Sequence, residues 1–213
     1  MHSTSTHETP EFAVHGRGRV LGFTDGASVD VREVDAKDWE LLKAFTYVAQ
    51  DENYTVAIGQ KTDFASIPRP VVWFIPTYGK YTKAAILHDH LCELAHRGKF
   101  SRRDADGIFR QAMRVLGVAF LRRWIMWAGV RLGALTSADG RKGWWRDAWR
   151  VVLIGIPVLP IIVPAALLVS LTLLVWFVVE FAFYLPLELT RRVKVKRNKP
   201  AKKVNMPSLS FRL

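Results

Sequence analysis

The chain has a single cysteine, Cys92, so an internal disulfide framework is excluded. It also lacks a glycine-rich phosphate-binding loop, a serine nucleophile elbow and paired zinc-type cysteines, which removes three common signatures of enzymes and metal proteins. The first residues are polar, with Glu8 and Glu11 where a secretory signal would have a basic stretch and an apolar core. We therefore expect any membrane insertion to be directed by a later segment.

Length and charge narrow the choice of partners. At 213 residues the chain has room for one modest soluble domain and a membrane segment, and a second full globular domain would not fit. Lysine and arginine total 31 against 19 acidic residues, a net charge of +12 that favours phospholipid headgroups or nucleic acid. The basic tail has no aromatic residues to stack on bases. Membrane lipids with anionic headgroups are therefore the expected partners, and nucleic acid is not expected.

An almost uninterrupted apolar stretch covers residues 151–187. Within it, residues 165–185 would span about 31 Å as a helix at roughly 1.5 Å per residue, enough to cross the hydrocarbon core. Three prolines separate this span from residues 151–163, which would form a shallow re-entrant arm or a bent extension. Residues 137–150 form a linker that ends in a tryptophan and arginine collar, typical of a bilayer interface. A buried helix of a soluble protein is disfavoured, because nothing else in the chain is large enough to cover it.

Basic residues border both ends of the stretch, and most of them lie in the tail, residues 188–213. Under the positive-inside bias this fits a hairpin with both ends in the cytoplasm, or a single crossing with a cytoplasmic C-terminal tail. Glu180 is the one ionisable residue deep in the stretch. It fits either a helix–helix contact or a side chain that reaches toward the interface.

The residues ahead of the membrane stretch predict a disordered tail over 1–14 and an α+β domain over 15–136. The expected elements are a hairpin that turns at Asp25-Gly26, a short helix from Asp35 to Phe45, a strand over 54–58, and helices over 83–96, 101–117 and 120–135. The predicted fold is therefore a small antiparallel β-layer followed by a three-helix unit, plus a C-terminal transmembrane helical segment.

The first of the three helices concentrates the reactive side chains. His88, Cys92 and His96 recur every four residues and share one face, whereas Asp89 points about 100° away. Asp106 lies on the next helix, which a short connection would fold back antiparallel. A histidine held at one nitrogen by a carboxylate can use the other nitrogen to take a proton from water. Asp89 would then be free to hold a hard cation such as Ca²⁺ that stabilises an oxyanion.

Three blocks occur in order along the chain: TDFASIP at 62–68, AAILHDHL at 84–91 and RDADGIFRQAM at 103–113. Together they resemble a family of unknown function that is widespread in bacteriophages and prophages. The resemblance covers roughly residues 15–135. It implies a phage-encoded protein, located in the bacterial host inner membrane or in the virion, with other phage proteins among its partners.

The His-Asp helix followed by an Ala-Asp helix more remotely resembles phospholipases A2, particularly the short form carried in parvovirus capsids. This resemblance implies His88 as general base, Asp89 as calcium ligand and Asp106 as the group that orients His88, with calcium as cofactor. Cys92 stands where those enzymes have a tyrosine, and only Gly79 stands in the region of their glycine-rich calcium loop.

Further residues leave the site open to other interpretations. Asp63, Ser66 and Cys92 are candidates to line the same cleft, and Asp63 and Ser66 alternatively cap the turn into the proline-rich loop that follows. A zinc site built from His88, Cys92 and His96 with a carboxylate is a further option, because thiolate and imidazole are preferred zinc ligands. Three ligands on successive turns of one straight helix do not easily converge on one ion.

Two functions remain open at this point. The first is a membrane-anchored hydrolase that acts on lipid or another ester at the bilayer surface, with His88 and Asp106 as catalytic residues. The second is a non-catalytic virion or host-envelope membrane protein, in which the same two residues only hold two helices together. An imidazole nitrogen that faces an open cleft would favour the first, and a closed apolar surround would favour the second.

Overall fold

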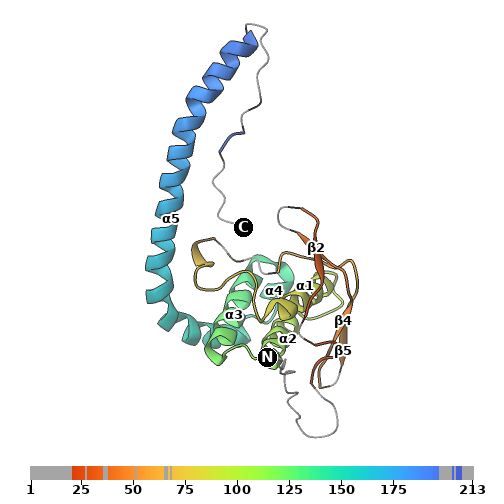
Figure 1. Ribbon diagram of the computed structural model, residues 1–213. Coiled ribbons are helices and arrows are strands. Elements are labelled where there is room, and N and C mark those ends of the chain that lie inside the picture. The colour runs from red at the N-terminus through yellow and green to blue at the C-terminus, as the bar shows by residue number, and fades with distance from the viewer. Residues whose placement is uncertain are drawn as a thin grey trace, which may run out of the picture. The chain divides into compact units, whose positions relative to one another are not determined.

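The computed structural model describes residues 21–26, 28–35, 38–50, 52–64, 67, 69–196, 203 and 205–207. The chain divides into two compact units, one made of Met1–Ser66 and Ile75–Val158 and the other of Ile67–Phe74 and Leu159–Leu213. The strands are β1 Gly22–Phe23, β2 Val31–Glu33, β3 Trp39–Leu41, β4 Phe45–Val48, β5 Asn53–Val56 and β6 Lys61–Thr62 (Figure 1). The helices are η1 Arg69–Val71, α1 Thr82–His96, α2 Arg102–Val115, α3 Phe120–Gly133, η2 Ala134–Thr136, α4 Ala138–Arg141 and α5 Trp145–Lys196.

The strands form two small antiparallel sheets, with the orders β1-β4-β5 and β2-β3-β6. The predicted α+β class is confirmed. The hairpin predicted at Asp25-Gly26 is wrong, because β1 pairs with β4 and β2 pairs with β3, so the two strands beside that turn belong to different sheets. Gly26 still occupies a turn conformation with φ +77°, but the chain that leaves it does not return along β1.

The helix predicted from Asp35 to Phe45 is also wrong, since this segment holds strands β3 and β4. Asp35 does accept a backbone N–H, that of Asp38 at 3.0 Å, but the bond closes a turn into a strand. In β4 and just after it the buried residues follow a period of two, namely Phe45, Tyr47 and Ala49. The strand predicted over 54–58 is confirmed as β5.

Helices α1, α2 and α3 pack in succession, and α1 lies against β5 (Figure 1). Ser101 caps α2 as the sequence predicts, its hydroxyl accepting the backbone N–H of Asp104 at 3.4 Å. The inner faces of the first two helices are apolar and fully buried at Leu87, Leu91 and Met113. These three helices therefore position the reactive side chains.

Lys83 is a buried lysine at the start of α1, with 1% of its side chain exposed. Its ammonium group donates to the carboxylate of Asp25 at 3.0 Å and to the carbonyl of Gly26 at 2.6 Å. It also lies about 5 Å from the ring centroids of Phe23 and Phe45. The Asp25-Gly26 turn thus accepts the hydrogen bonds of Lys83, and these bonds join α1 to the sheet β1-β4-β5.

The apolar stretch belongs to α5, one continuous helix of 52 residues. The prolines at 157, 160 and 164 do not interrupt it, and the helix continues past the predicted span to Lys196. In an apolar helix a proline removes one internal hydrogen bond, and neighbouring backbone adjusts without ending the helix. Between Trp145 and Lys196 the chain does not reverse, so the hairpin alternative is not found in the part that the structure describes.

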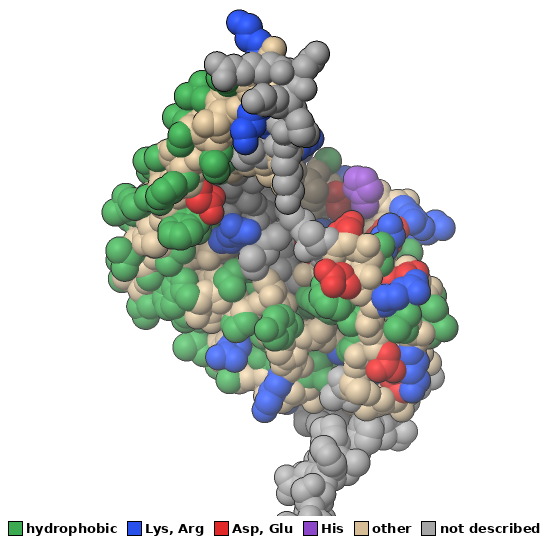
Figure 2. Space-filling view, turned by 45° about the horizontal axis from the view of Figure 1, so that its top comes forward, with side chains coloured by type: hydrophobic (Ala, Val, Ile, Leu, Met, Phe, Trp, Pro, Cys, Tyr) green, Lys and Arg blue, Asp and Glu red, His purple; other side chains and the backbone are tan. Residues whose placement is uncertain are grey.

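Helix α5 is long and apolar enough to cross a membrane, and among the described residues it is the one helix with this property. Only 6% of its most apolar 18-residue window is buried, unlike the core helix of a soluble protein. Figure 2 shows hydrophobic side chains along this helix. Leu168 and Phe183 are among its exposed residues. Glu180 is not an isolated charge, because it accepts the indole N–H of Trp176 at 2.7 Å one turn earlier.

The predicted disordered tail, residues 1–14, lies outside the described residues. The basic tail is described as helix up to Lys196 and then only at 203 and 205–207. Near its start Glu188 pairs with Arg191 at 2.6 Å and with Arg192 at 3.1 Å.

Candidate functional site

His88 on α1 and Asp106 on α2 lie side by side, as their positions on two neighbouring helices predicted. The imidazole Nε2 of His88 is 2.7 Å from Oδ1 of Asp106, and the bond is buried. The His88 side chain is 9% exposed, and its ring lies against the ring of Phe109 with centroids 4.8 Å apart. The imidazole therefore sits between a carboxylate and an aromatic ring inside the helical core.

Asp106 has a second strong partner that the sequence analysis missed. Its other oxygen, Oδ2, accepts from Nη1 of Arg131 on α3 at 2.8 Å, and both side chains are fully buried. Nε of Arg102, one turn earlier on α2, lies 3.4 Å from Oδ1. Burial alone would raise the pKa of Asp106, but the hydrogen bonds from His88 and Arg131 outweigh it and hold the pKa below its usual range.

Arg131 links Asp106 to a second buried carboxylate, Asp147, at the start of α5. Nη2 of Arg131 lies 3.6 Å from Asp147, which also accepts two hydrogen bonds from Arg103 at 2.7 and 3.2 Å. The indole of Trp144 donates to the backbone carbonyl of Arg131 at 2.7 Å. We call His88, Asp106, Arg131, Asp147 and Arg103 the buried ionic network. It joins α1, α2, α3 and the first turn of α5.

Cys92 lies one turn after His88, with Sγ 3.4 Å from the imidazole Nε2. His88, Cys92 and Asp106 are a group of three metal-type side chains, with ligand atoms within 4.8 Å of one another, and His96 is not part of it. The group does not fit zinc. Asp106 is already paired with Arg131, and burial raises the pKa of the Cys92 thiol to about 12, so the thiolate that zinc requires is disfavoured.

Asp89, the predicted calcium ligand, points away from His88 to the loop after β6. The hydroxyl of Thr62 donates to its carboxylate at 2.6 Å. Burial raises the pKa of Asp89 to about 8, against the lowering effect of this hydrogen bond, and the neighbouring charge of Asp63 raises it too. The group is therefore largely protonated at neutral pH, and a protonated carboxyl is a poor calcium ligand.

Two of the three sequence blocks meet at this contact, because Thr62 opens the first block and Asp89 belongs to the second. Thr62 also accepts the backbone N–H of Phe64 at 2.9 Å. Phe64 has φ +64°, a conformation that side chains other than glycine adopt rarely. Its ring packs on Trp39 with centroids 5.5 Å apart, which holds the strained residue in place. Ser66, the other predicted cleft residue of this block, lies outside the described residues.

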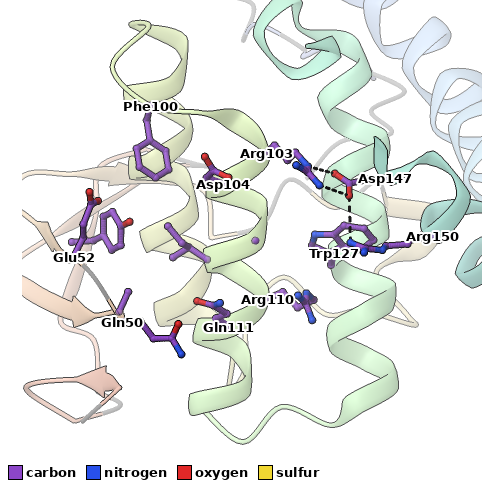
Figure 3. Close-up of a pocket in the computed structure, with 14 residues that line it drawn as sticks. Gln50, Glu52, Phe100, Arg103, Asp104, Arg110, Gln111, Trp127, Asp147 and Arg150 are labelled. Atoms are coloured by element: carbon purple, nitrogen blue, oxygen red, sulfur yellow. Dashed lines mark hydrogen bonds and ion pairs between the residues drawn. The ribbon is translucent and has the colours of Figure 1, made fainter. Parts of the chain in front are cut away.

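A pocket of about 580 Å³ opens elsewhere in the same unit, and neither His88 nor Asp89 lines it (Figure 3). Its lining residues are Ala49, Gln50, Glu52, Tyr54, Phe100, Arg103, Asp104, Gly107, Ile108, Arg110, Gln111, Trp127, Asp147 and Arg150. None of these residues was predicted as a site residue, although six of them belong to the third sequence block, 103–113. Two more, Asp147 and Arg150, belong to the predicted tryptophan and arginine collar.

Comparison with known proteins identifies one uncharacterised family. A family model described as "Protein of unknown function (DUF1353)" matches residues 39–130. No curated protein and no solved structure matches the chain. The matched region contains all three sequence blocks and ends one residue before Arg131. A domain of unknown function is therefore supported over residues 39–130, which include strands β3–β6 and most of the three-helix unit.

Proposed function

We propose that this chain is a membrane-anchored protein that acts by binding, and that the His88–Asp106 pair is structural. The observation that carries the proposal is the second partner of Asp106. Its second oxygen pairs with the fully buried Arg131, so the carboxylate is held between α1 and α3 instead of serving His88 alone. The pair is better suited to fixing the positions of α1, α2 and α3.

The surroundings of His88 support the same conclusion. A general base must reach a water molecule and a substrate, whereas this imidazole is largely enclosed by Phe109 and Asp106. The described pocket is lined by other residues. The neighbouring acid, Asp89, is held by Thr62 and is neutral near pH 7 because of burial.

A phospholipase A2-like hydrolase is the second candidate, and one distance favours it. The 2.7 Å separation of His88 Nε2 from Asp106 is the geometry that orients an imidazole so that its other nitrogen can take a proton. In that case Asp89 would lose its proton to bind calcium, and the substrate would be a lipid ester at the bilayer surface.

The proposed location rests on α5 and its basic end. Arg191, Arg192 and Lys194 follow the apolar part of the helix, and the positive-inside bias favours a cytoplasmic C-terminal end. The resemblance to bacteriophage and prophage proteins supports a bacterial host inner membrane, or a virion, as the site of action, with other phage proteins as partners.

The two candidates separate in one assay of the full chain reconstituted in liposomes with millimolar calcium. We expect fatty acid release at the rate of protein-free liposomes, for the parent and for His88→Gln alike. Release by the parent that is lost in a folded His88→Gln variant would overturn the structural role. The exposed His96, on the same helix, provides the matched control as His96→Gln.

A further inference from the structure

The pocket in the soluble unit is a trough whose two ends carry opposite charge (Figure 3). Helix α2 forms the floor, the connection between β4 and β5 forms one wall, and α3 with the first turn of α5 forms the other. Glu52 and Phe100 lie on one side of α2 in Figure 3, and Trp127, Asp147 and Arg150 lie on the other side. The lining is therefore polar, with acidic side chains at one end and basic side chains at the other.

The basic end contains Arg103, Arg110 and Arg150, with Asp147 as the one carboxylate among its lining residues. Asp147 is shared, because Arg103, Arg150 and the buried Arg131 all lie within ion-pair distance of it. One carboxylate cannot neutralise this many guanidinium groups. An anion that entered this end of the pocket would complete the charge balance.

Arg110 is the clearest sign of a missing anion. No acidic group of the described residues lies within ion-pair distance of it, and its Nε is buried without a hydrogen-bond partner. Its guanidinium stacks on the ring of Trp124 at 4.2 Å, which fixes its position. Burial lowers the pKa of Arg110, and the like charges of Arg150 and Arg123 lower it further. A phosphate placed against this guanidinium would supply the missing negative charge.

The other end of the pocket offers the complementary chemistry. Glu52 and Asp104 are both exposed, and no basic residue lies among the lining residues at this end. Beside them the rings of Tyr54 and Phe100 meet edge to face, with centroids 5.8 Å apart. Carboxylates together with aromatic rings are the groups that proteins use to bind an ammonium ion.

We infer that this pocket binds a zwitterionic headgroup in which a phosphate diester is joined to an ammonium group, as in an ethanolamine phospholipid. The phosphate would lie against Arg110 and Arg150, and the ammonium group against Glu52 and Asp104. The volume is within the range of small-molecule sites, and the polar lining suits a headgroup better than an acyl chain.

The position of the pocket in the chain favours a lipid as the source of this headgroup. Arg150 lines the pocket, and the apolar part of α5 begins at the next residue, Val151. Trp145 and Trp149 beside it are 83% and 60% exposed, as tryptophans at a bilayer surface are. This choice of source rests on the proposed membrane anchoring, whereas the headgroup chemistry itself does not.

The test begins with the full chain in an uncharged maltoside detergent, titrated calorimetrically with three soluble probes. Glycerophosphoethanolamine carries both charges, glycerophosphoglycerol carries only the phosphate, and ethanolamine carries only the ammonium. We expect the first to bind at least about tenfold more tightly than the second, and the third not to bind, since losing one charge-assisted contact costs on the order of one tenfold step. Equal binding of the two phosphate diesters, or no binding of either, would reject the inference.

Variants locate the site. Arg110→Gln should weaken glycerophosphoethanolamine binding at least about tenfold, and Glu52→Gln should remove the preference over glycerophosphoglycerol. Gly107→Leu should abolish binding while the fold is kept, because a side chain added at Gly107 meets nothing within 4 Å and extends into the pocket. Arg122→Gln, an exposed arginine on α3 outside the pocket, is the matched control. Unchanged binding by Arg110→Gln and Gly107→Leu would contradict the assignment.

A second arm separates the sources of the headgroup. The parent and Gly107→Leu are placed in nanodiscs that contain equal amounts of ethanolamine and glycerol phospholipids, and the retained lipid is identified by native mass spectrometry. Retention of the ethanolamine lipid by the parent alone assigns the lipid, and calorimetric binding without retention assigns a free phosphate ester. The calorimetric arm does not need a bilayer, so its failure would leave the proposed anchoring intact.

Discussion

At the scale of single residues, Asp106 makes the most consequential contacts in the described structure. It is fully buried and carries a negative charge, which is tolerated only because His88, Arg131 and Arg102 surround it. Arg131 in turn has no other carboxylate closer than Asp147 at 3.6 Å. Removing Asp106 leaves the charge of Arg131 buried without its partner. The resulting loss of folding free energy is far larger than the net contribution of the intact pair.

Asp106→Ala should therefore lower the free energy of unfolding by about 3–5 kcal/mol, the usual cost of breaking a buried ion pair. The reason is that Arg131 stays buried with its charge uncompensated. The measurement is denaturant unfolding of the full chain in detergent. Asp104→Ala, on the same helix but exposed, is the control and should cost less than about 1 kcal/mol. A similar loss in both variants would contradict the central place of Asp106.

Asp89 should give the protein an unusual pH dependence. Its pKa is raised from 3.8 to about 8 in the folded state, so between these values the folded chain holds a proton that the unfolded chain releases. The contribution of this group to stability is therefore complete below about pH 4 and is lost as the pH rises toward 8.

Asp89→Asn should remove this loss, because the amide keeps the Thr62 hydrogen bond and never ionises. Relative to the parent, the variant should gain about 1–3 kcal/mol between pH 5 and pH 9, the usual cost of an uncompensated buried polar group. Thermal unfolding at both pH values measures the difference. Glu93→Gln, exposed on the same helix, should show no such gain, and a parallel pH dependence in parent and Asp89→Asn would contradict the raised pKa.

The His88–Asp106 contact was predictable and the Arg131 contact was not. A short connection forces the two helices to pack side by side. The positions of His88 and Asp106 along them were therefore enough to predict their contact. Arg131 comes from a third helix, and in the sequence it looks the same as Arg122 and Arg123, which lie elsewhere on that helix. Only the three-dimensional packing tells which of the three arginines faces inward.

At the scale of elements, local signals identified the helices but not the strand pairing. A capping residue and a helical period are local, so α1, α2 and α3 were predicted close to their observed bounds. Strand pairing is non-local: Gly22 pairs with Val48, and no local pattern near the Asp25-Gly26 turn indicates that partner. The role of Asp35 was also ambiguous in the sequence, because an aspartate side chain can either cap a helix or close a turn that leads into a strand.

The first turn of α5 is attached to the helical frame through Asp147. Asp147→Ala should release this turn, because Arg103, Arg131 and Arg150 would lose their common partner. We expect amide hydrogen exchange across residues 145–151 to speed up at least about tenfold, with little change in α1. Asp139→Ala, in the short helix α4, is the control. An unchanged exchange rate over 145–151 would show that apolar contacts, such as Trp127 with Val151, hold the turn without the ion pairs.

At the scale of the whole molecule, the chain combines a small α+β unit with a long apolar helix, and only 6% of the most apolar window of that helix is buried. The structure agrees with the sequence here, since an apolar stretch of this length with basic borders predicts a membrane helix on composition alone. The continuity of α5 through three prolines was not predicted, because the local pattern of a proline favours the end or a bend of a helix.

Alkaline extraction of membranes that contain the full chain tests whether α5 anchors the protein in the bilayer. The parent should stay with the membrane pellet at pH 11. A variant with Leu168→Arg, Leu171→Arg and Val175→Arg should move to the soluble fraction, because each arginine costs about 2.5–3.5 kcal/mol at the bilayer centre. Release of the parent by alkali, in the same fraction as the triple variant, would contradict the account.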